Sequence, residues 1–136
     1  MSNNGLTFFR ILFTVAALWN LAGGIPGYFD SANMFHRLFD RELTDPLMMA
    51  IYKGSWGTTF LYFFGYLLVA YNPVRHTGIV ILGTIGKMFF AAGLLKAYLS
   101  GMATSFALVV IAGDFIFIAL FITYFICMTR RQEGLF

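Results

Sequence analysis

Four long apolar runs, separated by short polar segments, leave few folds open to this chain. They cover about residues 6–24, 46–71, 77–99 and 103–128. Each is close in length to the roughly 20 residues that a helix needs to cross the hydrocarbon core of a bilayer. Backbone groups in lipid must be hydrogen-bonded internally, and a helix achieves this within one segment. The sequence therefore predicts an all-α fold, an integral membrane four-helix bundle.

The composition supports a membrane protein rather than a soluble one. The chain has 136 residues, of which 60% are hydrophobic and 11% are charged, whereas about 25% are charged in a typical soluble domain. A globule of this size cannot bury so much apolar surface, but a bilayer can cover it. We therefore expect residues 1–136 to form a single transmembrane domain with the lipid bilayer as its partner. The net charge of +3 is scattered, which argues against a nucleic-acid partner.

Turn and cap residues mark the expected helix ends. The cluster from Gly23 to Gly27, which contains Pro26, predicts the end of the first run. Pro46 is placed for a first helical position, with Thr44 or Asp45 as the cap. The first run is expected to be a retained membrane helix rather than a signal peptide. Its basic flank is only Arg10, and no small-x-small cleavage pattern follows the end of the run at Gly24.

The segment of about residues 30–45, between the first two runs, is amphipathic. Its apolar positions are spaced for one helical face and its charged positions for the other: Phe35, Leu38, Phe39 and Leu43 against Arg37, Asp40 and Arg41. This pattern predicts an interfacial helix between helices 1 and 2 of the bundle. It could be a lid over a cavity, or a connector that lies flat on the membrane surface.

The distribution of arginines predicts the orientation of a multi-pass protein in a cell inner membrane. The short tails and turns on one side carry Arg10, Arg75, Arg130 and Arg131, and the other side carries Arg37 and Arg41. Positive residues in short segments favour the cytoplasmic side. Both termini are thus expected in the cytoplasm, with the amphipathic segment outside.

Lys87 and Asp114 lie alone inside the third and fourth apolar runs. Lys87 precedes the expected turn at Gly101 by fourteen residues, and Asp114 follows that turn by thirteen. At about 1.5 Å per helical residue, both side chains reach a similar depth. A charge at that depth is costly unless it is paired or beside water or a ligand. The two could form a structural ion pair, line a polar pocket or relay, or fail to meet.

A second group of polar residues lies toward the amphipathic segment. Asn20 is near the end of the first run, and Lys53 and Trp56 are in the opening turns of the second. With Lys87 and Asp114 at the floor, these three residues are expected nearer the mouth of a ligand pocket. Glycine stripes in the second and third runs allow close helix packing, either within the bundle or at a homodimer seam.

The sequence offers no support for a metal or cofactor. His36 and Asp40 are one helical turn apart and could form half a metal site, whereas a catalytic metal normally needs three protein ligands. The other histidine, His76, is expected on the opposite side of the membrane. Cys127 is the single cysteine, which excludes an internal disulfide and a cysteine-based metal site. No catalytic triad or nucleotide-binding motif is present.

Several short segments resemble sequences found in small bacterial membrane proteins. They are Arg10-Ile11-Leu12, Asn20-Leu21-Ala22-Gly23, Gly65-Tyr66-Leu67-Leu68-Val69-Ala70 and Gly113-Asp114-Phe115-Ile116-Phe117. With four spans filling the chain, the layout resembles the largely uncharacterised four-helix proteins grouped as DoxX-like. This resemblance implies a bacterial inner-membrane bundle, sometimes an accessory to a redox enzyme, usually without an assigned activity.

Three function classes remain open. The favoured hypothesis is a small inner-membrane protein that binds an apolar or lipid-like molecule, or an accessory subunit of a larger membrane complex. The alternative is a homo-oligomeric, proton-coupled transporter in which Lys87 or Asp114 changes protonation. An intramembrane enzyme acting on a lipid is the least favoured, because no second acid, base or metal site is expected at the depth of Asp114.

Overall fold

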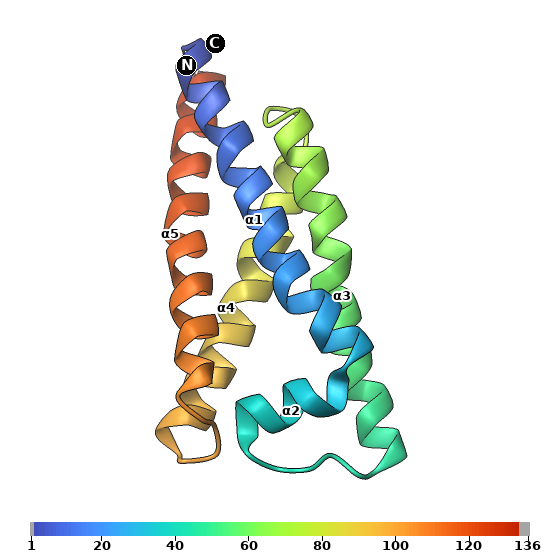
Figure 1. The fold of residues 1–136 in the computed structure, drawn as a ribbon. Coiled ribbons are helices and arrows are strands. Elements are labelled where there is room, and N and C mark those ends of the chain that lie inside the picture. Colours follow the sequence, from blue (N-terminus) through green and yellow to red (C-terminus); the bar gives the residue numbers. More distant parts are fainter. Residues whose placement is uncertain (1, 134–136) are drawn as a thin grey trace.

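A computed structural model describes residues 2–133, and this part of the chain is helical throughout apart from short connections. The helices are α1 (Asn3–Phe29), α2 (Ser31–Phe39), α3 (Pro46–Tyr71), α4 (Thr77–Leu99) and α5 (Phe106–Glu133). Four of them are long and lie side by side, whereas the short α2 crosses one end of the bundle (Figure 1). Both termini lie at the other end. The predicted all-helical fold is confirmed.

Three of the described helices are long and apolar enough to cross a membrane. They are α1, α4 and α5, the last over Phe106–Arg131. The bounds of α3 agree with the second predicted run, but α3 is not among the three. A polar and aromatic stretch, Ser55-Trp56-Gly57-Thr58-Thr59, lowers its hydropathy. The prediction of four spans therefore stays a prediction, while three candidate spans are found.

The end of α1 was predicted wrongly from its glycines. The helix does not stop near Gly24 but continues through Pro26 to Phe29. A Cβ atom on Gly24 would lie only 2.9 Å from the Cα of Phe60, and a Cβ on Gly27 would overlap the indole of Trp56. These glycines permit close packing of α1 against α3. That packing offsets the cost of about 1 kcal/mol per glycine in a helix.

The amphipathic helix α2 is shorter than predicted. Asp40 adopts a left-handed conformation, with φ of 51°, and ends the helix. Leu43, expected on its apolar face, therefore lies outside it. The buried side chains Ser31, Met34 and Leu38 form one face of α2. Hydrogen bonds from the backbone N–H and the side chain of Thr104 fix its last turn, at 2.7 and 2.6 Å. The helix is thus tied to the connection that precedes α5.

Local sequence signals determine where α3 begins and where α4 ends. The side chain of Asp45 accepts a hydrogen bond from the backbone N–H of Met48 at 2.8 Å, with Pro46 at the start of the helix. Gly101, with φ of +75°, makes the turn after α4, a conformation that glycine adopts without steric cost. The fourth predicted run began at residue 103, whereas α5 begins at Phe106, because Thr104 is engaged by α2.

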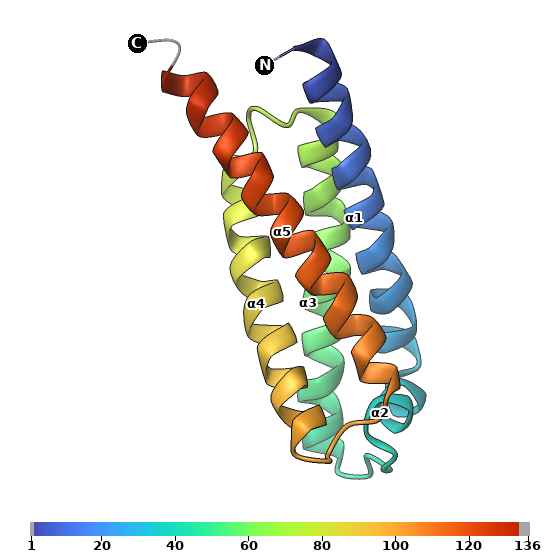
Figure 2. The ribbon, with the colours of Figure 1, turned by 90° about the vertical axis from the view of Figure 1, so that its left-hand side faces the viewer.

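The bundle consists of two closely packed helix pairs. The helices α1 and α3 form one pair, and α4 and α5 form the other (Figure 2). Between the pairs, at the end that carries the termini, aromatic side chains fill the interior. Phe13, Tyr66, Phe121 and Tyr124 are each at most 1% exposed, and the rings of Phe13 and Phe121 stack with centroids 5.1 Å apart. A cavity lies on the α2 side of this aromatic layer.

Substitution of Gly24 tests the packing of α1 on α3. We expect Gly24→Ala to lower the free energy of unfolding by about 1–3 kcal/mol, the usual cost of overpacking, because the Cβ meets the backbone of Phe60. The matched control is Gly93→Ala on α4, where a Cβ has nothing within 4 Å. Unfolding in mixed micelles measures both. Equal stability of the two variants would contradict this packing.

Candidate functional site

Lys87 and Asp114 lie in contact inside the second helix pair. The Lys87 Nζ is 2.8 Å from Oδ1 of Asp114, and the residues are 8% and 4% exposed. Their meeting follows from the hairpin of α4 and α5 about Gly101, which places them at one depth. The rings of Tyr66 and Phe117 lie 5.9 and 5.5 Å from the ammonium and add a cation–π attraction.

Asn20 lies deeper than predicted. Its Oδ1 accepts a hydrogen bond from Lys87 Nζ at 3.0 Å, and its Nδ2 donates to the backbone carbonyl of Thr59 at 3.0 Å. Asn20 therefore belongs to the floor with Lys87, not to the mouth. The expected ending of α1 near Gly24 caused this error, because the longer helix places Asn20 about two turns from its end.

Trp19 bonds Asp114, a contact that was not predicted from the sequence. Its indole Nε1 donates to Oδ1 of Asp114 at 3.1 Å. Gly113 makes this possible, since any Cβ there would overlap the Trp19 ring. Two signals could have found this contact. A buried indole N–H needs an acceptor, and the glycine beside Asp114 leaves room for a large neighbour.

Trp19, Asn20, Lys87 and Asp114 together form the polar cluster. Trp19 and Asn20 come from α1, Lys87 from α4 and Asp114 from α5, so the cluster joins the two helix pairs. Both bonds to Asp114 use the same oxygen, Oδ1. Among the described residues, no donor is bonded to the second oxygen. Lys87 has three N–H donors and two acceptors here.

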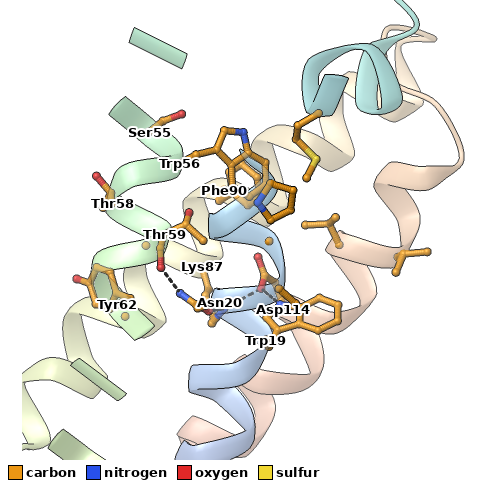
Figure 3. A pocket seen from close by; sticks show the side chains of 18 of the residues that line it. Trp19, Asn20, Ser55, Trp56, Thr58, Thr59, Tyr62, Lys87, Phe90 and Asp114 are labelled. Carbon is orange, nitrogen blue, oxygen red and sulfur yellow. Dashed lines mark hydrogen bonds and ion pairs between the residues drawn. The ribbon is translucent and has the colours of Figure 1, made fainter. Parts of the chain in front are cut away.

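A cavity of about 500 Å³ lies beside the polar cluster. The cluster forms one end, and Met34 and Arg37 of α2 contribute to the other. Trp56 and Phe90 lie between them, with ring centroids 5.9 Å apart (Figure 3). The guanidinium of Arg37 stacks over the ring of Phe106 at 4.1 Å. The cavity is thus mainly apolar, with charged groups at its two ends and the hydroxyl-bearing residues Ser55, Thr58, Thr59 and Tyr62 among its lining.

Exposed residues border this cavity on two sides. Thr58 and Gly86 are exposed lining residues from α3 and α4, and Ala22 and Val109 are exposed lining residues from α1 and α5. The cavity therefore opens sideways between helices on both sides. In a bilayer, such openings face the surrounding lipid.

Lys53 does not lie where the sequence analysis expected it. It is exposed and is not among the residues that line the cavity. Its ammonium lies 4.8 Å from the centroid of the Tyr28 ring. Tyr52 and Trp56 contact each other on the inner face of α3, with centroids 6.3 Å apart. The next residue after Tyr52 is turned by about 100°, which carries Lys53 outward.

His36 on α2 and Asp40, which follows the helix, form only a weak surface contact. The Nε2 of His36 lies 3.9 Å from Oδ1 of Asp40, and both side chains are exposed. In the described part of the chain, no group of three or more His, Cys, Asp or Glu residues could hold a metal ion. The only described cysteine, Cys127, is half-buried.

Comparisons with known proteins add no assignment to this site. No family model, no curated protein and no solved structure matches the chain. The resemblance to DoxX-like proteins therefore stays an expectation based on short segments.

Removal of one partner tests the energetic role of the ion pair. We expect Lys87→Met to lower the free energy of unfolding by about 3–5 kcal/mol, because it leaves a buried carboxylate unpaired. The double variant Lys87→Met, Asp114→Leu should recover most of this loss, since no buried charge remains. Unfolding in mixed micelles measures each variant. A double variant that loses the sum of both single effects would show that the two residues are not coupled.

Proposed function

We propose that this chain is a small multi-pass inner-membrane protein that binds an apolar, lipid-like molecule in the cavity beside the polar cluster. In this proposal α1, α3, α4 and α5 all span the bilayer. The helix α2 lies at the membrane surface and covers one end of the cavity. The arginines at the end with the termini support a cytoplasmic location for that end.

The cavity is the observation that carries this proposal. Its volume of about 500 Å³ falls in the range of roughly 300–1,000 Å³ typical of small-molecule sites. Such sites combine apolar walls with a few polar groups that fix the orientation of the ligand. Here Trp56 and Phe90 belong to the walls, and Lys87 and Asp114 are the polar groups.

The side openings support a ligand that comes from the bilayer. Thr58 and Gly86 border one opening, at a level where a spanning bundle faces hydrocarbon. A molecule dissolved in lipid could enter there without crossing water. This route favours a lipid-like ligand over a polar metabolite.

The aromatic layer favours binding over transport. A carrier needs a path that reaches both membrane surfaces, but Phe13, Phe121 and Tyr124 are completely buried between the cavity and the termini. The polar cluster also offers a single carboxylate and a single ammonium, which bond each other. This arrangement favours a binding role, alone or as an accessory subunit, over an enzyme that acts on lipids.

Tryptophan fluorescence offers a direct test. The chain has two tryptophans, Trp19 and Trp56, and both line the cavity. In phosphatidylcholine nanodiscs, we expect saturable quenching by at least one of three terminally brominated probes: dodecane, dodecanol or dodecanoate. Bromine quenches on contact, so saturation reports occupation of the cavity. Quenching that only rises linearly with the probe content of the bilayer would contradict the proposal.

A matched pair of glycine variants separates cavity binding from contact with bulk lipid. Gly86 lines the cavity, whereas Gly93, two turns later on α4, does not. A Cβ has nothing within 4 Å at either position. We expect Gly86→Leu to weaken binding of the quenching probe roughly tenfold, equivalent to about 1.4 kcal/mol, because leucine takes up cavity volume. Gly93→Leu should bind as the unchanged protein does. Equal affinities would place the probe elsewhere.

A further inference from the structure

The hydrogen bonds of Asp114 are distributed unevenly over its two oxygens. Oδ1 accepts from Lys87 at 2.8 Å and from Trp19 at 3.1 Å. Oδ2 receives no hydrogen bond from the described residues. In Figure 3, one carboxylate oxygen of Asp114 makes the hydrogen bonds, and the other is directed toward Trp56 and Phe90. A strong acceptor thus faces the cavity.

Lys87 supplies a donor at the same end of the cavity. Its ammonium has three N–H groups and bonds to Asn20 and Asp114, which leaves one N–H. Lys87 and Asp114 both line the cavity. The floor therefore presents one acceptor and one donor, from two side chains that bond each other through Oδ1.

The charges of the floor select the kind of head group that fits. A carboxylate could accept from Lys87, but Asp114 would repel it. An ammonium could donate to Asp114, but Lys87 would repel it. A hydroxyl group both donates and accepts and carries no charge. It can therefore satisfy both floor residues without repulsion from either.

We infer that the ligand is a long-chain alcohol, bound with its hydroxyl group at the floor. The hydroxyl donates to Oδ2 of Asp114 and accepts from Nζ of Lys87, and its hydrocarbon chain runs past Trp56 and Phe90 toward α2. This inference rests on the proposed binding function and specifies its ligand. The reverse orientation would hold an anionic head group at Arg37 and place a methyl group on the floor, where Oδ2 of Asp114 and one N–H of Lys87 would stay without a partner.

Competition between matched chains tests this inference. In nanodiscs, terminally brominated dodecanol quenches the tryptophans, and unbrominated dodecane, dodecanol, dodecanoate and dodecylammonium compete at equal mole fractions in the bilayer. The pH is chosen so that the last two are ionised. We expect dodecanol to compete roughly tenfold more effectively than dodecane, because it gains a hydrogen bond to a charged group. Both ionised chains should compete less effectively than dodecanol.

Two variants test whether the floor residues cause the preference for dodecanol over dodecane. In Lys87→Met, Asp114→Leu, the floor loses the carboxylate and the ammonium that hold the hydroxyl group, so the advantage of dodecanol over dodecane should largely disappear. The control is Arg37→Gln at the far end of the cavity, which should keep the full preference for dodecanol. Circular dichroism and the elution volume of both variants verify that they remain folded.

Each outcome separates the inference from the proposed function. Preference for dodecanol that disappears in the double variant supports the inference. Equal competition by dodecane, or stronger competition by dodecanoate that Arg37→Gln abolishes, overturns the inference and leaves the binding function intact. If no probe quenches in a saturable manner, both are overturned.

Discussion

The hydrogen bonds of the polar cluster are the constraint on which the rest of the bundle depends. In the apolar interior of the bundle, a charge or amide without a partner is strongly unfavourable, so Lys87, Asp114 and Asn20 must find one another. Lys87 and Asp114 fix the register of α4 against α5, and Asn20 fixes α1 against both α4 and the backbone of α3. Small apolar side chains could slide past one another, whereas these bonds allow one depth only.

The cavity follows from how side-chain volume is distributed around this fixed point. Toward the termini, Phe13, Phe121 and Tyr124 fill the space between the helix pairs. Toward α2, the cavity lining includes Gly86, where a Cβ would meet nothing within 4 Å. The helices cannot collapse onto this gap, because the polar cluster and the aromatic layer hold the pairs apart. Gly86 thus leaves open space in the cavity, whereas Gly24, Gly27 and Gly83 allow Phe60, Trp56 and Tyr66 to approach closely.

Much of the fold could be predicted where the signal is local. Pro46 with Asp45, and Gly101 with its positive φ, set helix ends through backbone chemistry alone. The equal depth of Lys87 and Asp114 followed from helical rise. The end of α1 could not be predicted, because tertiary contacts of Gly24 and Gly27 outweigh their helix-breaking tendency. Because the end of α1 was predicted too early, Asn20 was expected at the mouth of the cavity. Lys53 was also expected there, but its direction depends on which face of α3 packs inward.

The structural and functional interpretations of Lys87 and Asp114 are compatible. If the ion pair only fixed the helix register, we would expect both carboxylate oxygens of Asp114 to accept hydrogen bonds from the protein, since each unsatisfied acceptor is costly in a low-dielectric interior. Here Trp19 and Lys87 share Oδ1, and Oδ2 faces the cavity. Gly113 is essential to this arrangement, because its missing side chain lets Trp19 approach Oδ1 from below. The same contacts that hold the bundle together thereby leave an acceptor that faces the cavity.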